Sequence, residues 1–459
     1  MKRRGVPLSD APAKSSSDDR GVQSLAGRRV LIVGTGKEGR AIADAVDGIA
    51  ASAIAYNDAE GDSVDAWRNT WGQRIPVVVG ESPGGIDVVI ASPGVSKHHP
   101  LLRSMRESGV VVTSGTSLWL AEHAASTIGV TGSKGKSTTS SLIHHLTARL
   151  VGDVVLGGNI GLPLLAMPPA PRYVVELSSY QCSALTVSPA TVVLTSLFPE
   201  HLDWHGSEDD YYADKLNIVA HGPRAVILNA LDPRLVDQIR RRFEELEYEP
   251  VGLPQSFHVA DGWFRHGEIA LFERSALPLR GDHNATNACL ALAALDANGY
   301  SILDNAPAVA QALAEFHPLE HRLEEIPDAA GITFVDDSLS TSPYAAIEAM
   351  RAFAPAPLTL LVGGQDRGVD YAPLIDYVAE HPICAVIGLP GSGAHLTEMM
   401  PEAQPVAVAA DMGDAVRKAR ALTPRGGIVL LSPAAPSYGF YANYAERAAD
   451  FRHAIETTR

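Results

Sequence analysis

The sequence predicts an α/β protein of three domains with parallel sheets. Short apolar runs rich in β-branched residues, each ended by glycine or proline, alternate with stretches of helical spacing. Continuous apolar strands that alternate with helices are typical of parallel sheets covered on both faces. The pattern begins with a glycine-rich turn at residue 34 and begins again with another at residue 132. The length of 459 residues suits about three domains of roughly 150 residues each.

Composition excludes several classes of protein. Hydrophobic residues make up 46% of the chain and charged residues 20%, as in ordinary globular proteins. Residues 1–27 are polar and are expected to form a disordered tail. The net charge of −16 has the wrong sign for binding a nucleic-acid backbone. The three cysteines, Cys182, Cys289 and Cys384, are widely separated, which favours a reducing cytoplasm over a disulfide framework or structural zinc. No apolar run is long enough for a membrane span or a secretion signal.

The first domain is expected at residues 28–121 and to be Rossmann-like. Its strands are predicted at 30–33, 53–56, 76–80 and 87–94. The first strand leads into a GxGxxG turn formed by Gly34, Gly36 and Gly39, with Asp58 about 20 residues later, which favours a phosphate-containing ligand at a helix N-terminus. This motif alone is weak and also fits a nicotinamide-dependent dehydrogenase. A second turn of small residues after the fourth strand either borders the same ligand or is a plain turn. It consists of Ser92, Pro93 and Gly94.

The second domain, at 122–300, carries the most specific motif. A strand at 128–131 ends in a glycine-rich loop, and a helix begins near Lys136. The loop has the pattern GxxGK[ST], shorter than the general phosphate loop because residue 130 is valine. Its backbone amides can surround phosphates, and a hydroxyl can bind Mg²⁺, so we expect ATP binding on a P-loop ATPase-type parallel sheet. The loop residues are Gly132, Ser133, Lys134, Gly135, Lys136, Ser137 and Thr138.

Two polar residues follow neighbouring strands of the same domain. Glu176 lies in a strand run at 172–179, and His201 follows the run at 190–197. Mg²⁺ prefers oxygen ligands, so Glu176 and Ser137 are candidates for one ion and His201 for a second. Taken alone, each of these residue types more often has a structural role. The phosphate loop in the same domain favours a metal-binding role for both. A further strand is expected at 224–230, and a helix at 284–297.

The third domain is expected at 301–459 and is again Rossmann-like. Its predicted strands have helical stretches between them, as in the first domain. They lie at 331–338, 357–364, 383–390 and 426–433.

Nine short motifs follow one another along the second and third domains. They are TGSKGKST at 131–138, GGNIG at 157–161, VVELSSYQ at 174–181, EHLDWHG at 200–206, YYADKLNI at 211–218, GDHNATNA at 281–288, HR at 321–322, DDS at 336–338 and LSPAAPS at 431–437. In this order they resemble the motifs of the Mur ligases, most closely the glutamate-adding branch. The resemblance extends from about residue 28 to the C-terminus, and the three-domain plan of that family agrees with the predicted pattern.

The resemblance implies a cytoplasmic, ATP-dependent amide ligase of peptidoglycan synthesis, which serves cell-wall biogenesis, cell shape and cell division. It would join glutamate to UDP-N-acetylmuramoyl-L-alanine through an acyl phosphate, act as a monomer and bind neither nucleic acid nor membrane. The GxGxxG domain would bind the nucleotide sugar, with Asp58 and Ser92 to Gly94 near it.

The resemblance also assigns residues to ATP and two Mg²⁺ ions. Lys136, Ser137 and Thr138 would hold the phosphates and magnesium. Glu176 would bind one ion, and His201 with a carbamylated Lys215 the other. The remaining ligand-facing positions are Asn159, Asn287 with its neighbours His283 and Asn284 near the adenine, and Arg322 and Asp337, which would close over ATP.

One motif departs from the family. Leu339 stands where the D-glutamate-adding enzymes have a lysine that contacts the incoming glutamate, and His317 lies near the place of a missing threonine. Ser437 is kept, and Tyr444 represents the aromatic residue that follows it. Two changed contacts favour a repositioned glutamate of L configuration, with the D-glutamate-adding activity as the alternative.

Other readings are a folylpolyglutamate synthase-like ligase, a nicotinamide-dependent dehydrogenase and a non-catalytic nucleotide sensor. The first leaves the GxGxxG domain unexplained. The second leaves the phosphate loop and Glu176 without a role. The third leaves the metal-binding candidates without a role.

Overall fold

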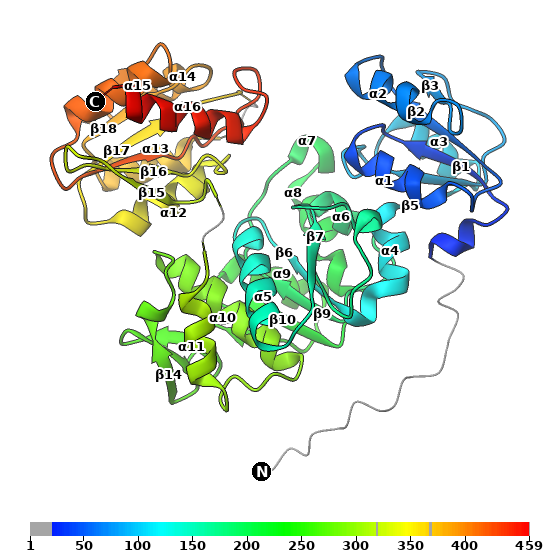
Figure 1. The fold of residues 1–459 in the computed structure, drawn as a ribbon, viewed down its shortest axis with the longest axis horizontal. Helices are drawn as coiled ribbons and strands as arrows, with labels where there is room; N and C mark the ends of the chain where they lie inside the picture. Colours follow the sequence, from blue (N-terminus) through cyan, green and yellow to red (C-terminus); the bar gives the residue numbers. More distant parts are fainter. Residues whose placement is uncertain (1–20, 318–319, 367–369, 459) are drawn as a thin grey trace. The chain divides into compact units, whose positions relative to one another are not determined.

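The computed structural model describes residues 21–317, 320–366 and 370–458, except for the side chain of Asp203. The chain forms two compact units. Of the described residues, the first unit comprises 21–258, 266–269 and 290–305, and the second 259–265, 270–289 and 306–458. Figure 1 shows the ribbon coloured along the sequence.

The first unit begins with a five-stranded parallel sheet of order β3-β2-β1-β4-β5. Its strands are β1 (Arg29–Val33), β2 (Ser52–Asn57), β3 (Val77–Val79), β4 (Val88–Ala91) and β5 (Val111–Ser114). Val30 and Ile32 pack into one apolar cluster, and Leu31 and Val33 into another on the opposite face. The accompanying helices are η2 (Val22–Leu25), α1 (Lys37–Val46), α2 (Asp62–Trp71), α3 (Pro100–Glu107) and α4 (Gly115–His123). The strand order reverses between β1 and β4, the place where such sheets bind ligands.

The second sheet of this unit is six-stranded and parallel, with the order β11-β10-β9-β6-β8-β7. Its strands are β6 (Thr127–Thr131), β7 (Val155–Gly158), β8 (Tyr173–Glu176), β9 (Thr191–Leu194), β10 (Ala225–Asn229) and β11 (Glu249–Val251). Its helices are η3 (Ala124–Ser126), α5 (Lys136–Leu150), η4 (Leu164–Ala166), α6 (Ser179–Ser183), α7 (Leu202–His205), α8 (Glu208–Leu216), η5 (Asn217–Val219) and α9 (Pro233–Arg242). Because β8 and β9 flank β6, the segments that follow these three strands lie at one edge of the sheet.

The second unit contains a six-stranded sheet of order β15-β16-β20-β17-β18-β19, in which only β15 is antiparallel. Its strands are β15 (Glu324–Pro327), β16 (Thr333–Asp336), β17 (Leu358–Val362), β18 (Ala385–Gly388), β19 (Val406–Val408) and β20 (Ile428–Leu431). Its helices are α11 (Ala306–Ala314), α12 (Pro343–Phe353), α13 (Ala372–Glu380), α14 (Gly393–Glu398), α15 (Met412–Leu422) and α16 (Tyr444–Thr457).

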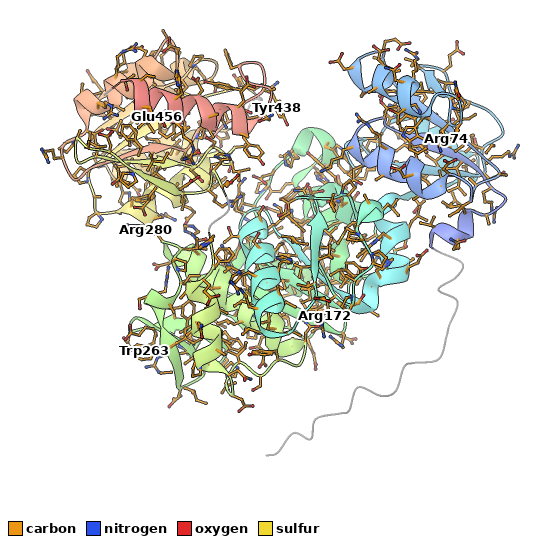
Figure 2. All side chains as sticks on the ribbon, in the orientation of Figure 1. Arg74, Arg172, Trp263, Arg280, Tyr438 and Glu456 are labelled. Atoms are coloured by element: carbon orange, nitrogen blue, oxygen red, sulfur yellow. The ribbon has the colours of Figure 1, made fainter. Side chains whose placement is uncertain are left out.

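A small three-stranded sheet and a long helix lie between these parts of the sequence. The sheet has the order β12-β13-β14. Trp263, labelled in Figure 2, is in its middle strand and is 38% exposed. The elements are β12 (Phe257–Ala260), β13 (Trp263–His266), β14 (Ile269–Glu273), η6 (Arg274–Ala276) and α10 (Asp282–Ala297).

The ordered chain begins before the expected boundary at residue 28. Leu25 is only 2% exposed and belongs to the apolar cluster beneath β1, and the amide of Val22 donates to Glu122 at 2.8 Å. One apolar side chain and one hydrogen bond thus fix this turn, although the polar composition of residues 1–27 predicted no ordered structure there. Residues 1–20 of the predicted tail lie outside the described residues. Among those that are described, no helix is both long and apolar enough to cross a membrane.

Candidate functional site

The GxGxxG turn lies at the reversal point of the first sheet. Gly34 follows β1 with φ of +102°, a conformation that favours glycine, and a Cβ there would lie 2.8 Å from the hydroxyl of Ser92. A Cβ on Gly39 would lie 1.9 Å from the carbonyl oxygen of Gly34. Gly36 is the residue before helix α1, whose first backbone amides point into the turn. The structure therefore brings the GxGxxG turn and the turn that begins at Ser92 together, which favours the first of the two interpretations left open by the sequence.

Asp58 follows the neighbouring strand β2 and is held by two residues that sequence reasoning missed. Its Oδ1 accepts from the hydroxyl of Tyr56 at 2.9 Å and lies 2.9 Å from Nε2 of His99. The carboxylate remains 65% exposed, so it is accessible to a ligand. Pro93 and Gly94 continue the turn after β4.

A methyl group at Gly39 should disrupt this turn. We expect Gly39→Ala to weaken binding of uridine diphosphate at least tenfold, because the new Cβ would overlap the Gly34 carbonyl and displace the backbone amides. Calorimetric titration measures the effect. Gly84→Ala in the same domain is the matched control, since Gly84 is exposed and no described atom lies within 4 Å of its Cβ position. Equal affinities of the two variants would contradict the prediction.

The phosphate loop follows β6 and leads directly into α5. Gly132 has φ of +151°, and a Cβ there would lie 2.0 Å from the Thr195 hydroxyl oxygen. The amide of Lys134 donates to Ser196 at 2.8 Å, and the hydroxyl of Ser133 bonds the Phe198 carbonyl at 2.7 Å. The segment after β9 therefore braces the loop from the side. Gly135 also has positive φ (+86°), and Ser137 and Thr138 lie in the first turn of α5.

Two lysines converge on one backbone oxygen of this loop. Lys136 donates to the Gly132 carbonyl at 2.9 Å and to that of Ser133 at 2.9 Å, and Lys215 donates to the Gly132 carbonyl at 2.8 Å. Lys215 is 2% exposed. Burial, and secondarily the charge of Lys136, lowers the pKa of Lys215 to about 7. Two converging amines beside the phosphate loop favour an anion at this place.

His201 lies beside these lysines, just before α7. Its backbone has a left-handed φ of +55°, and its ring lies 5.1 Å from that of Tyr180. Desolvation lowers the pKa of His201, and the positive charges of Lys134, Lys136 and Lys215 act in the same direction. The imidazole is therefore neutral at neutral pH, the form that binds metal ions. Lys134 is paired with Glu200 at 2.8 Å.

Glu176, at the end of β8, has the arrangement expected of a metal ligand. Its side chain is 1% exposed, and Oε1 accepts from the side-chain amide of Asn159 at 2.7 Å. The other oxygen, Oε2, is buried and has no hydrogen-bond partner among the described residues. A buried carboxylate oxygen without a partner is costly unless a cation or another donor binds it. The oxygen donors of Glu176 and of Ser137, in the first turn of α5, are therefore of the type that Mg²⁺ prefers.

The second unit brings Arg322 and Asp337 into electrostatic contact. Asp337 is 3% exposed and accepts from the hydroxyls of Ser340 at 2.5 Å and Ser432 at 2.8 Å. Burial raises the pKa of Asp337 to about 6, and the charge of Arg322 opposes this shift. Nε of Arg322 is buried and has no hydrogen-bond partner in the described part of the chain. The two residues thus form a polar pair that retains bonding capacity for a ligand.

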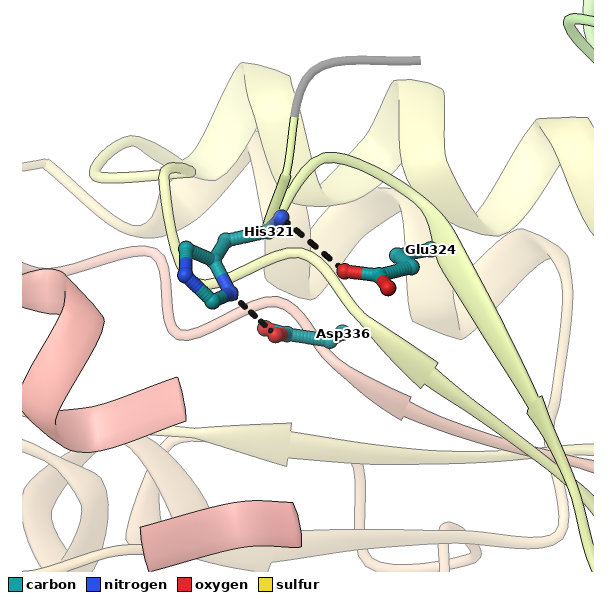
Figure 3. Close-up of side chains that lie close together, drawn as sticks. All are labelled: His321, Glu324 and Asp336. Atoms are coloured by element: carbon teal, nitrogen blue, oxygen red, sulfur yellow. Dashed lines mark hydrogen bonds and ion pairs between the residues drawn. The ribbon is translucent and has the colours of Figure 1, made fainter. Parts of the chain in front are cut away.

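Next to this pair, His321, Glu324 and Asp336 form the cluster in Figure 3. Nδ1 of His321 lies 2.7 Å from Asp336, and its amide donates to Glu324 at 3.3 Å. The donor atoms are close enough for a metal ion, but the guanidinium of Arg452 lies 2.5 Å from Glu324 and 3.9 Å from Asp336. Arg452 already supplies positive charge, so we assign no metal here. The cluster fixes the loop that carries Arg322.

The residues expected to contact glutamate lie in several segments of the second unit. The amide of Leu339 donates to the His321 carbonyl at 3.3 Å, and the ring of Tyr444 lies 6.0 Å from that of His321. Ser437 lines a cavity of about 290 Å³ at the carboxyl ends of β17 and β18, together with Tyr441. Exposed aromatic residues surround the serine: Tyr438, labelled in Figure 2, and Phe440 are each 53% exposed. His317 is exposed after α11.

Asn287 lies in α10 and is 6% exposed. Its amide donates to Asn284 at 3.2 Å, and Asn284 donates to the Arg280 carbonyl at 2.8 Å. Nδ1 of His283 lies 3.6 Å from Glu348. The adenine motif of the sequence is thus held by contacts within α10, with the residue at 280 before it and with Glu348 of α12.

Sequence reasoning missed Arg447, which also lines the cavity. It is 1% exposed and donates to the carbonyls of Ala435 at 3.1 Å and Ser338 at 2.9 Å, thereby joining the segments that lead to Ser437 and Leu339. Burial lowers the pKa of Arg447 to about 10. Helix α16 carries other charged residues of similar spacing, so no local signal distinguished this arginine from an exposed one.

Comparison with known proteins agrees with this arrangement. A family model described as the Mur ligase middle domain matches residues 130–295. The chain is 49% identical to a UDP-N-acetylmuramoyl-L-alanine--L-glutamate ligase of Salinispora tropica, over 95% of this chain and 99% of that protein. It is 36% identical to a protein of the same name from Xanthomonas euvesicatoria, over 94% and 95% of the two chains.

Solved structures share the fold. UDP-N-acetylmuramate-alanine ligase MurC of Thermotoga maritima is 17% identical and superposes with a TM-score of 0.57, over 94% of this chain and all of that chain. A pseudomurein peptide ligase type C of Methanothermus fervidus, 14% identical, gives 0.58 over the same shares. Because these solved structures share the fold, the predicted α/β architecture is confirmed. Since relatives up to 49% identical match nearly the full length of both chains, this chain belongs to the Mur ligase family.

Proposed function

We propose that the protein is an ATP-dependent ligase that joins L-glutamate to UDP-N-acetylmuramoyl-L-alanine. The observation that carries this proposal is the edge of the second sheet, where Lys136, Lys215, His201 and the unpartnered oxygen of Glu176 surround a phosphate loop. Relatives at 49% and 48% identity bear the name of this activity. Mur ligases use ATP and Mg²⁺. Because its nucleotide substrates are cytoplasmic metabolites, we place the reaction in the cytoplasm, and a monomeric state stays a prediction.

The phosphate loop would bind ATP and direct its γ-phosphate. Backbone amides at the start of α5 and the ammonium of Lys136 reduce the repulsion between the phosphates and an approaching carboxylate. The alanine carboxylate of the precursor forms a bond to the γ-phosphorus, and ADP leaves, which gives an acyl phosphate. The amine of glutamate then forms the amide bond, loses one proton and displaces phosphate.

Magnesium would supply further positive charge to the phosphates. Glu176 and Ser137 are the proposed holders of one ion, and His201 and Lys215 of the other. Lys215 suits this role because its buried amine has a pKa of about 7, so a large fraction is neutral at physiological pH. A neutral amine reacts with CO₂ to give a carbamate and a proton, and the resulting anion would lie beside Lys136. Asn159 would hold Glu176 in place.

The first sheet would bind the uridine diphosphate part of the substrate. Its reversal point presents the backbone amides that follow Gly34 and the small residues after β4, which suits a diphosphate. The proposed contacts are Gly34, Gly36, Gly39, Asp58, Ser92, Pro93 and Gly94.

The second unit would hold the incoming glutamate, and its Arg322 and Asp337 stay proposed contacts of ATP. Ser437 lines its cavity, and Arg322 and Asp337 carry unsatisfied or perturbed polar groups. Leu339 cannot neutralise a carboxylate, so the glutamate must contact other groups than in enzymes with a lysine there. This difference and the names of the relatives both favour L-glutamate over the D-glutamate alternative. His317 and Tyr444 stay proposed contacts of glutamate, and Asn287 of adenine.

Phosphate release from ATP and Mg²⁺ tests the proposal directly. We expect release that requires both UDP-N-acetylmuramoyl-L-alanine and L-glutamate, with D-glutamate at least tenfold less effective. Release with D-glutamate alone would retain the ligase and overturn the stereochemical assignment. Absence of release with either amino acid would overturn the proposed reaction.

A further inference from the structure

One imidazole joins three of the segments proposed to carry magnesium ligands, those of Glu176, His201 and Lys215. His205, in α7, is 0% exposed. Its Nδ1 lies 2.7 Å from Asp214, the residue before Lys215, and its Nε2 lies 2.9 Å from the hydroxyl of Ser179, three residues after Glu176. His205 itself lies four residues after His201, in the same short helix region. Displacement of His205 would therefore disturb all three segments at once.

Aromatic packing extends this connection to the phosphate loop. The ring of Tyr180 stacks on His205 with centroids 5.6 Å apart and also contacts His201 at 5.1 Å. Tyr211 meets His205 edge-on at 5.2 Å, and its hydroxyl bonds Ser133 at 2.7 Å. The imidazole thus has fixed neighbours on its faces as well as on both nitrogens.

The loop between β4 and α3 completes the network from outside. Nζ of Lys97 lies 2.8 Å from the carboxylate of Asp214, Ser96 donates to the Trp204 carbonyl at 2.9 Å, and Nε2 of His98 lies 3.1 Å from the His205 carbonyl. These residues follow the turn of Ser92, Pro93 and Gly94 directly. The segment 96–98 therefore connects the proposed nucleotide-sugar turn with α7 and α8.

The order Ser179, His205, Asp214 has the hydrogen bonds of a nucleophilic triad, but its burial excludes that role. Ser179 is 3% exposed and His205 is 0% exposed, so no substrate carbonyl can reach the serine hydroxyl. The network also differs from a triad because Lys97 already neutralises the aspartate. Its remaining function is to hold neighbouring groups in position.

We propose that Lys97 is a positioning residue for the metal centre, acting through Asp214 and His205 on Glu176, His201 and Lys215. The inference rests on the proposed metal-binding role of those three residues. Residues that orient metal ligands from outside commonly change metal affinity by about 10–100-fold. Because Lys97 lies close behind the Ser92–Gly94 turn, binding of the nucleotide sugar and binding of metal nucleotide should be coupled, and the coupling is reciprocal.

Substitution of Lys97 by methionine in the full chain tests this role. The side chain is 28% exposed, so the variant should fold. Titration calorimetry with Mg²⁺ and a non-hydrolysable ATP analogue should show metal affinity weakened by about tenfold, whereas binding of uridine diphosphate without metal stays within twofold of the wild type. Lys97→Arg should recover part of the metal affinity, since it restores the charge at Asp214. Arg103→Met, an exposed cation in the same domain, is the matched control and should leave both affinities unchanged.

Other outcomes separate this inference from the proposed reaction. Unchanged metal affinity in Lys97→Met would overturn the positioning role, even if the enzyme is active. Parallel losses of uridine diphosphate and metal binding would indicate a merely structural contact and would overturn it as well. If the wild type releases no phosphate with any glutamate, the proposed reaction fails, but the metal titration still tests Lys97. In Asp214→Asn, the further addition of Lys97→Met should have little additional effect, because the carboxylate that the lysine contacts is gone.

Discussion

Lys136→Met should lower kcat for phosphate release by about 10²–10³-fold, the usual cost of removing one group that stabilises transition-state charge. The lysine begins α5, and its ammonium lies 2.9 Å from the carbonyls of Gly132 and Ser133, above the loop expected to bind phosphates. Methionine keeps much of the length and removes the charge. The measurement is steady-state phosphate release with saturating ATP, nucleotide sugar and L-glutamate.

Lys134→Met provides a comparison two residues away in the same loop. Its ammonium is already paired with Glu200 at 2.8 Å, so less of its charge acts on a bound phosphate. We expect a loss of less than about tenfold. Equal losses in the two variants would contradict the separate roles assigned to the two lysines, and full activity of Lys136→Met would contradict the phosphate-binding role of the loop.

The phosphate loop could be predicted from sequence because its chemistry is local. Gly132 to Thr138 are consecutive, and a strand and a helix flank them in both sequence and structure. Glu176 could be predicted for a related reason, since β8 lies beside β6 and its end reaches the same edge. The separate network of Lys97, His205 and Asp214 could not, because its members are more than 100 residues apart at the greatest separation and form no motif.

The same distinction applies to the fold. Every predicted strand of the three large sheets is present. All but the edge strand β3 are central strands, which have continuous apolar runs because both of their faces are covered. Besides the three strands of the small sheet, β12, β13 and β14, four strands of the parallel sheets were missed: β5, β7, β11 and β19. Each lies at a sheet edge, has only three or four residues and is partly exposed, so its composition resembles that of a loop. The strand β15 was missed for another reason, since its antiparallel pairing with β16 gives an alternating burial pattern rather than an apolar run.

In the second unit, the resemblance to the Mur ligases identified candidate site residues, but the contacts of these residues could not be predicted from the sequence. Arg322 and Asp337 were each predicted to close over ATP, and the structure brings the two residues into electrostatic contact. The cluster of His321, Glu324 and Asp336 that fixes their loop depends on Arg452 in the last helix, more than 100 residues away. Long-range ion pairs of this kind depend on how α16 packs on the sheet, which no local pattern specifies.

Lys215→Met should strongly lower turnover and, at the same time, stabilise the fold. The wild-type amine has a pKa of about 7 in the folded protein, and 10.5 is its ordinary value. Below pH 7 the buried ammonium is charged in both states, so it destabilises the fold in full; the penalty shrinks as the pH rises towards 10.5 and vanishes above it. Methionine is uncharged at every pH. In CO₂-free buffer, calorimetry should therefore give the variant a higher Tm than the wild type at pH 6.5, with a difference that decreases towards pH 10.

The loss of activity has a separate cause, because methionine cannot form the proposed carbamate. We expect kcat to fall by about 10²–10³-fold, as for other groups that stabilise charge in the reaction. Wild type in ¹³C-labelled bicarbonate at pH 8 should show a protein-bound carbamate signal by NMR, and the variant should not. If the wild type is fully active but shows no carbamate signal, Lys215 is not part of the metal site. A lower Tm of the variant at pH 6.5 would mean that the hydrogen bond of Lys215 to the Gly132 carbonyl, 2.8 Å long, outweighs the cost of its buried charge.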